Sequence, residues 1–157
     1  MKKIGEYLIY RKEVCKVSDI KENNFTQKMC YTLIPESDKS LKMTVPVDNE
    51  HIRDLMTREE INELLSKIRQ IPVIEMEDKL LEAEYKRLLN EEKIEDIIKI
   101  IKTTYLRNQN RINNNKKISD KDNRYFEMAE NYLYQEIATV FEISLEEAKE
   151  FVIESVK

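Results

Sequence analysis

The amino-acid sequence predicts an α+β fold in which a small SH3-like β-roll precedes a domain of five α-helices. The first observation is a change of apolar spacing near residue 50. Before this point apolar residues alternate in short runs, as in strands, and after it they recur every three or four residues, as on a buried helix face. The second observation is that only one glycine and three prolines occur, which argues against a loop-rich protein. We therefore expect a β module over residues 1–53 and a helical domain over residues 54–157.

Four short apolar runs predict the strands of the β module. They cover residues 7–10, 14–20, 25–34 and 41–45, and a fifth short strand is expected at Ile52. Asn23 and Asn24 mark a turn after the second strand, because Asn tolerates left-handed backbone angles. If the resulting roll does not close completely, it leaves an edge strand to which another chain can pair.

The helices of the second part begin at recognisable capping residues. Thr57 and Glu60 form a capping box, and Ser119 and Ser144 precede two later apolar stripes in a similar way. The predicted helices with their caps cover residues 57–71, 75–89, 94–109, 119–141 and 144–156. Each has one apolar face and a short connection to the next, so we expect a compact helical bundle.

The composition argues against several classes of protein. No stretch approaches the ~18–20 apolar residues of a membrane span, and the first residues lack the apolar run of a secretion signal, so we expect a cytoplasmic protein without a membrane partner. Cys15 and Cys30 lie in adjacent predicted strands, and buried free thiols are favoured over the alternative of a disulfide between them. With His51 they fall short of a zinc-ligand pattern, and no glycine-rich phosphate-binding loop occurs. We therefore expect neither a metal nor another cofactor.

The sequence contains no recognisable catalytic constellation. His51 is the only histidine, and no Ser or Cys nucleophile motif surrounds it. The carboxylates fall mainly on polar helix faces, where pairs four residues apart, such as Glu82 and Lys86, explain them. A binding protein is therefore favoured over an enzyme.

Charge is unevenly distributed along the chain, whose net charge is −4. Residues 99–124 hold eight basic side chains and only two acidic ones. Such a basic island is typical of a surface that faces phosphate groups. The alternative is a solvated helix end whose Lys and Arg side chains complement the helix dipole.

The order of the elements is accompanied by short motifs at corresponding places. They are Gly5-Glu6-Tyr7-Leu8-Ile9-Tyr10, the strand at 41–45 followed by Pro46 and Asn49, Tyr85-Lys86, and Ile118-Ser119 followed by Asp122 and Arg124. In order and spacing they resemble the CarD/CdnL family of bacterial RNA polymerase-binding transcription regulators, over nearly the whole chain. No single motif is specific to the family.

The resemblance implies a Tudor-like N-terminal module that binds the β subunit of RNA polymerase through its sheet edge. The residues at the matching strand are Leu41, Lys42, Met43, Thr44, Val45 and Pro46. It also implies a helical domain that contacts promoter DNA, so that the protein modulates the stability of the open complex. With the basic island, this gives a DNA-contacting set of Leu81, Tyr85, Lys86, Lys116, Lys117, Lys121 and Arg124.

The chain also departs from the family pattern. The family inserts a tryptophan into the DNA minor groove, whereas this chain has no tryptophan and aligns Leu81 at that place. Leucine can also wedge between bases, but Leu81, Tyr85 and Leu88 are spaced as a core stripe, so core packing competes with DNA contact. Ala83 and Glu84 replace neighbouring basic residues. We expect weak DNA binding, mainly to phosphates, and the alternative is an interaction adaptor that binds polymerase or another partner without DNA. The sequence leaves the oligomeric state open.

Overall fold

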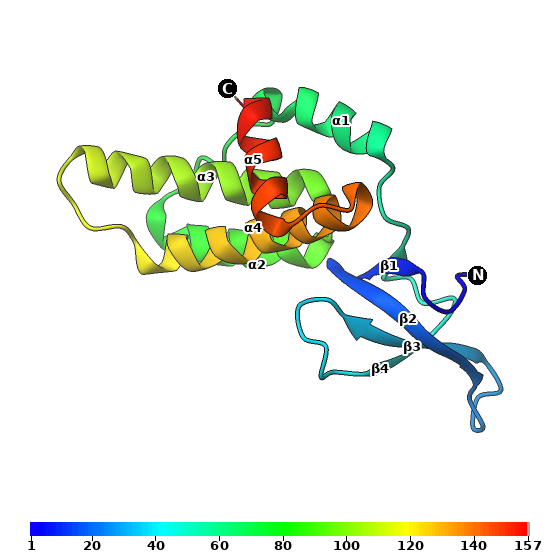
Figure 1. Cartoon of the computed structure of the whole chain (residues 1–157). Helices are drawn as coiled ribbons and strands as arrows, with labels where there is room; N and C mark the ends of the chain where they lie inside the picture. Colours follow the sequence, from blue (N-terminus) through cyan, green and yellow to red (C-terminus); the bar gives the residue numbers. More distant parts are fainter. Residues whose placement is uncertain (157) are drawn as a thin grey trace.

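A five-stranded antiparallel sheet is followed by five α-helices in the computed structural model, which describes residues 1–156 (Figure 1). The strands are β1 (Tyr7–Tyr10), β2 (Glu13–Glu22), β3 (Met29–Pro35), β4 (Met43–Pro46) and β5 (Ile52–Arg53). Their spatial order is β4-β3-β2-β1-β5, so the sheet does not close and β4 and β5 are its edges. The α+β class, the antiparallel roll and the short fifth strand are confirmed.

The strands follow the predicted alternation, with two differences at their starts. The third begins at Met29 rather than residue 25, because the Asn23 side chain accepts hydrogen bonds from the Phe25 and Thr26 N–H groups and holds the chain in a tight turn. The fourth begins at Met43 rather than residue 41. The inner face of the sheet has its own apolar core, which contains Leu8, Cys15, Val17, Tyr31, Leu33 and Val45.

The five helices are α1 (Arg58–Ser66), α2 (Asp78–Glu91), α3 (Ile94–Asn113), α4 (Asp120–Phe141) and α5 (Leu145–Val156), with a short 3-10 helix, η1 (Ile68–Gln70), after α1. Thr57 forms the predicted capping box with Glu60, and the Ser119 side chain caps α4. The third helix is longer than predicted and ends four residues later. Apolar stripes from all five helices meet in one core, which confirms the helical bundle.

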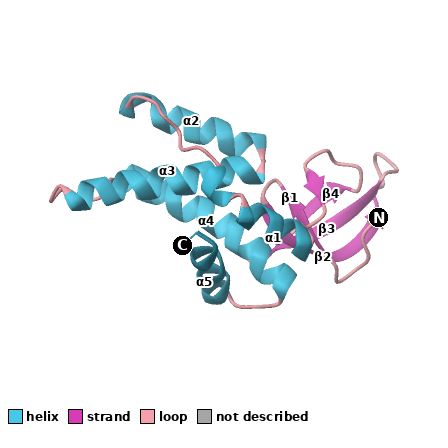
Figure 2. Ribbon diagram, turned by 90° about the horizontal axis from the view of Figure 1, so that it is seen from above, coloured by secondary structure: helices cyan, strands magenta, loops and turns pink. Residues whose placement is uncertain are grey.

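The helical part is built around α3 and α4, which pack against one another as an antiparallel pair (Figures 1 and 2). The free end of this pair, formed by the last turn of α3, residues 114–119 and the first turn of α4, projects away from the sheet (Figure 1). We call this end the α3–α4 tip. No helix within residues 1–156 is both long enough and apolar enough to cross a membrane.

The two parts are joined by an ion pair whose carboxylate is buried. The Arg53 guanidinium at the end of β5 donates to both carboxylate oxygens of Glu136 on α4, at 2.8 and 2.7 Å. The Met56 N–H donates to the same carboxylate at 2.8 Å, and the Glu136 residue is only 1% exposed. Strand β2 also packs against α4. The end of the sheet is therefore fixed to the helical core rather than hanging from a linker.

Candidate functional site

The residues predicted to bind polymerase form the outer edge of the sheet and the turn before it. Leu41 and Lys42 are exposed, and Met43, Thr44, Val45 and Pro46 make up β4. Strand β4 pairs with β3 on one side only. The Val45 side chain lies in the apolar core, so it anchors the strand rather than meeting solvent.

The hydrogen-bond alternation shows which main-chain groups this edge leaves open. The Val47 N–H donates to the Met29 carbonyl at 3.0 Å. In an antiparallel pair every second residue bonds inward, so Val45 and Met43 bond to β3 while the main-chain groups of Thr44 and Pro46 face outward. Pro46 costs the sheet no hydrogen bond, because its missing donor would have pointed to solvent. Thr44 therefore offers an open N–H and C=O at the middle of the edge.

Phe25 is a second exposed feature of the β module, and the sequence prediction missed it. It stands at the tip of the β2–β3 hairpin with 97% of its surface exposed. A hollow of about 340 Å³ lies between this tip and the outer face of β3 and β4, lined by Phe25, Thr32 and Thr44 among others. The sequence did contain an indication of this position, because Phe25 directly follows the turn-forming Asn23 and Asn24. We assigned Phe25 to the third strand instead.

Two residues predicted to contact DNA lie in the core, which corrects that part of the prediction. Leu81 is 1% exposed and Tyr85 is 0% exposed. The Tyr85 hydroxyl donates to the buried Asp122 carboxylate at 3.0 Å, and its ring packs 5.1 Å from that of Tyr125. Burial raises the pKa of Tyr85, with a further contribution from the Asp122 charge. These side chains hold α2 against α4 and present no surface to a nucleic acid.

The basic side chains of α2 and the start of α4 reach solvent but have acidic partners. Lys86 and Arg124 both pair with Glu82, at 3.7 and 3.2 Å, and Lys121 pairs with Asp78 at 3.6 Å. A paired cation attracts phosphate less strongly than a free one, because the carboxylate cancels much of its field. This group is therefore a weaker candidate for phosphate contact than its sequence suggests.

Three further members of the basic island stabilise the bundle. Arg107 pairs with Asp122 at 2.8 Å and with Asp78. Lys99 lies 3.8 Å from Asp96, and the Lys102 ammonium donates to main-chain carbonyls at the end of η1, among them that of Ile68 at 2.9 Å. These charges complement internal acids and main-chain carbonyls, a role that differs from both the phosphate-facing surface and the solvated helix end considered from the sequence.

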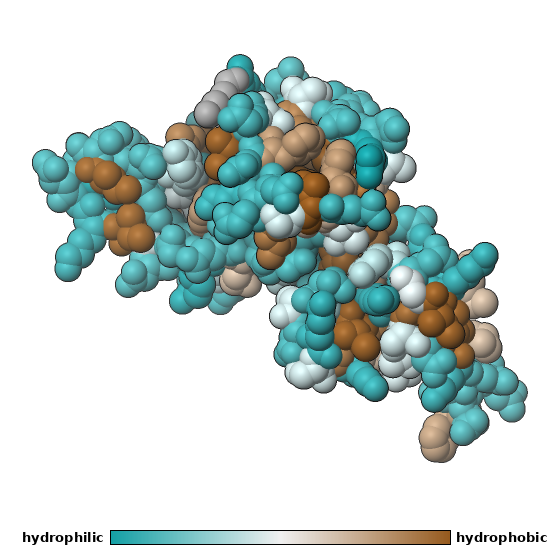
Figure 3. Space-filling model, in the orientation of Figure 1, coloured by the Kyte–Doolittle hydropathy of each residue, from teal (hydrophilic) through white to brown (hydrophobic). Residues whose placement is uncertain are grey.

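The remaining cations gather at the α3–α4 tip. Lys116 and Lys117 are exposed, Arg111 lies one turn before them, and none of the three forms an ion pair within residues 1–156. The end of α3 is fixed by hydrogen bonds from the Asn115 N–H to Ile112 and from the Lys116 N–H to Arg111. Figure 3 shows apolar residues at this end surrounded by hydrophilic ones, and Ile112 and Ile118 are exposed. The tip is thus an ordered basic surface with an apolar centre.

His51, the single histidine, lies between two acidic residues. The His51 ring lies 3.1 Å from Glu92 and 3.5 Å from Glu50, a pairing that ties the end of the sheet to α2. No group of three or more His, Cys, Asp or Glu residues within residues 1–156 is arranged to hold a metal ion. Cys15 and Cys30 are buried and free, as expected.

The chain matches no protein-family model and no curated protein in the comparisons made with it.

Proposed function

We propose that the chain is a non-enzymatic transcription regulator of the CarD/CdnL type. In this proposal a Tudor-like N-terminal module docks on the β subunit of bacterial RNA polymerase, and the helical domain touches promoter DNA and modulates the stability of the open complex. The observation that carries the proposal is the open edge of β4, with the Thr44 main-chain groups facing outward. An extended strand of a partner can add to such an edge through main-chain hydrogen bonds.

The docking step is tested by a substitution that changes only the outer side of β4. Thr44→Pro removes the outward N–H and spares the hydrogen bonds to β3, whereas Thr44→Val keeps that N–H and serves as the control. We expect Thr44→Pro to weaken co-purification of the full chain with RNA polymerase at least about tenfold, the equivalent of one good hydrogen bond. Equal binding by the Pro and Val variants would refute docking through this edge.

For DNA we propose contact through the α3–α4 tip rather than through α2. The supporting observation is that Arg111, Lys116 and Lys117 carry charge without an acidic partner within residues 1–156, whereas Lys86, Lys121 and Arg124 are paired. Contacts of this kind bind phosphates without reading sequence, so affinity should fall steeply with salt.

The DNA contact is tested by reversing two charges at the tip. Lys116→Glu with Lys117→Glu should weaken binding to promoter DNA and lower the slope of log affinity against log salt by about two. Lys3→Glu with Lys149→Glu, at two exposed positions away from the tip, makes the same change in net charge. Equal effects of the two pairs would show that total charge rather than the tip determines binding.

A second candidate is an adaptor that binds polymerase or another partner without DNA. The burial of Leu81 and Tyr85 favours it, because the two α2 residues that the resemblance assigns to the duplex lie in the core. The two candidates differ in one result: for an adaptor the tip reversal leaves transcription effects unchanged while Thr44→Pro still abolishes them.

A further inference from the structure

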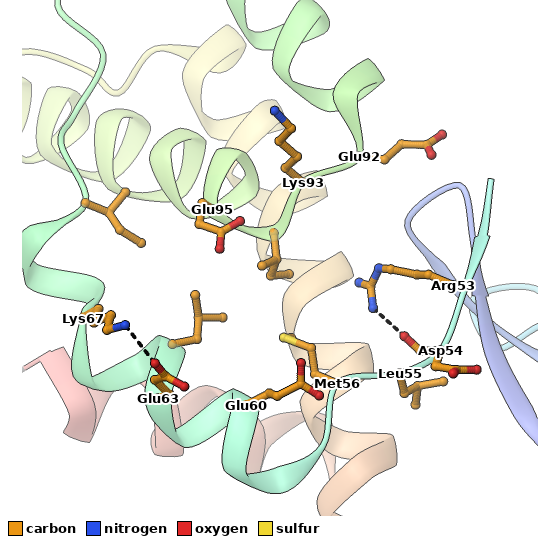
Figure 4. Close-up of a pocket in the computed structure, with 13 residues that line it drawn as sticks. Arg53, Asp54, Leu55, Met56, Glu60, Glu63, Lys67, Glu92, Lys93 and Glu95 are labelled. Atoms are coloured by element: carbon orange, nitrogen blue, oxygen red, sulfur yellow. Dashed lines mark hydrogen bonds and ion pairs between the residues drawn. The ribbon is translucent and has the colours of Figure 1, made fainter. Parts of the chain in front are cut away.

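An open groove of about 770 Å³ lies in the helical part (Figure 4). One wall is α1, and the opposite wall is the turn between α2 and α3 with the first residues of α3. The segment from Arg53 to Met56 closes one end, and Ile71 lies at the other. Helix α1 packs against α4 and α5, so the side that it turns toward α3 remains open.

The floor of the groove is apolar and only partly covered. Leu55, Met56, Ile71 and Ile94 line it, and each is half-buried rather than buried. The last three pack against the main core from its edge, so the groove is an opening in the surface of that core. An apolar strip with a polar rim is typical of a surface that a partner covers.

The rim of the groove is acidic. Five carboxylates and three cations line it, and each cation is already paired: Arg53 with Glu136, Lys67 with Glu63 at 2.8 Å, and Lys93 with Glu91 at 3.8 Å. Asp54 and Glu92 also have basic partners, Lys2 and His51, which leaves Glu60 and Glu95 as the acidic residues of the rim without one in the described chain. Figure 4 shows Lys93 pointing away from the groove and Glu95 pointing across it toward α1. Neither Glu60 nor Glu95 forms an ion pair with any residue from 1 to 156.

The N-terminus of α3 also lies at the groove and adds a partial positive charge, which would favour an anion. Its first turn carries Glu95, however, whose full negative charge outweighs the roughly half charge of a helix end; the neighbouring Asp96 is buried and paired with Lys99. The net field at the rim is therefore negative.

From this combination we propose that the groove binds a basic amphipathic helix of a partner protein. The apolar face of that helix packs on Met56, Ile71 and Ile94, and Lys or Arg side chains at its borders pair with Glu60 and Glu95. This mode of recognition, a helix in an apolar groove with complementary charges at the rim, is general among proteins. The site is separate from the β4 edge and from the α3–α4 tip, so it does not depend on the function proposed above.

The probe for this test is a fluorescein-labelled synthetic helix of roughly four turns, with Leu on one face and Lys on both borders. A companion peptide has Glu in place of every Lys. Fluorescence polarisation with the full chain should show binding of the Lys peptide and at least tenfold weaker binding of the Glu peptide. Failure of the Lys peptide to bind, or equal binding of both, overturns the proposal.

Two matched variants distinguish peptide binding in the groove from nonspecific attraction of the peptide to an acidic chain. Glu95 and Glu146 are both the second residue of a helix and both exposed, but only Glu95 lines the groove. Glu95→Lys should weaken binding of the Lys peptide about tenfold, because it replaces an attraction with a repulsion, and Glu146→Lys should change it less than twofold. Equal effects would mean that the peptide follows net charge, which overturns the proposal.

Methyl NMR spectra of the unmodified chain locate the peptide directly. Binding should shift the signals of Met56, Ile71 and Ile94 and leave those of Ile112 and Ile118, which are exposed at the α3–α4 tip, unchanged. Shifts confined to the tip would place the peptide elsewhere and overturn the proposal. The same groove signals shifting with protein concentration alone would identify a second copy of the chain as the occupant instead, which also overturns it.

Discussion

The ion pair between Arg53 and Glu136 is expected to be the most sensitive single point at the junction of the sheet and the helices. Arg53→Met removes the guanidinium that bonds to both Glu136 oxygens, at 2.7 and 2.8 Å. The carboxylate, in a residue only 1% exposed, then keeps the Met56 N–H as a donor and little else. A charge left in the interior without its partner destabilises the folded state strongly.

The size of the effect follows from how far each side chain is buried. Breaking a fully buried pair costs about 3–5 kcal/mol. The Arg53 side chain is 37% exposed, so water already screens part of the interaction, and we expect a loss of about 2–3 kcal/mol in the free energy of unfolding. For a chain of this length the corresponding fall in Tm is roughly 5–10 °C.

A double-mutant cycle with Glu136→Gln provides the assay, with urea unfolding followed by circular dichroism. Glutamine keeps an oxygen to accept the Met56 N–H but removes the charge. The double variant should therefore be more stable than Arg53→Met alone, with a coupling free energy of at least about 1 kcal/mol. An Arg53→Met variant within about 0.5 kcal/mol of the parent, or additive effects of the two changes, would contradict a stabilising pair between Arg53 and Glu136.

Three other predictions concern single positions. Tyr85→Phe removes the hydroxyl that donates to the buried Asp122, and should lower the free energy of unfolding by about 1–2 kcal/mol in urea titrations, whereas no effect would mean that the hydrogen bond is unimportant. Gly5→Ala should lower the free energy of unfolding by about 1 kcal/mol, because Gly5 has a φ of +92°, which alanine rarely adopts. No atom lies within 4 Å of the added Cβ, so a neutral result would contradict this explanation from the backbone conformation. Burial raises the pKa of Cys15 from 9.0 to about 12, so the unfolded chain loses this proton first and stability should fall as pH rises from about 9 toward 12. Cys15→Ala should make that fall shallower by up to about 1.4 kcal/mol per pH unit, and an unchanged slope would show that the thiol does not contribute.

The parts of the fold that the sequence predicted well are those decided by neighbours along the chain. Thr57 and Glu60 cap α1 through contacts three residues apart, and the period of apolar residues marks the face that each helix buries. The predicted start of β3, at residue 25, was wrong, and the reason is also local. The Asn23 side chain accepts hydrogen bonds from the Phe25 and Thr26 N–H groups, so these groups are not available to a strand. The alternation of apolar residues does not reveal this hydrogen bonding.

The candidate sites were harder to predict, because they depend on partners far away in sequence. Eight cations in one stretch indicated a phosphate-facing surface, but Arg107 pairs with Asp78 and Arg124 with Glu82, 29 and 42 residues away. Which basic side chains lack an acidic partner therefore depends on the folded structure. The spacing of Leu81, Tyr85 and Leu88 indicated a core stripe. All three side chains are buried, so the core stripe is correct, rather than the DNA contact that the resemblance implied for Leu81 and Tyr85. The acidic groove has no counterpart in any single stretch of sequence.

Helix α4 connects the α3–α4 tip with the end of the sheet. Its first turn belongs to the α3–α4 tip, and Glu136, sixteen residues after Asp120, holds Arg53 at the end of the sheet. At 1.5 Å per residue these two points lie about 24 Å apart along one uninterrupted helix. In the proposed function, a partner on the β4 edge and a phosphate group at the tip would be kept at a fixed separation, because the ion pair between Arg53 and Glu136 fixes the sheet to the helix. Binding at one end can then orient the other end, which a pair of domains on a flexible linker does not achieve.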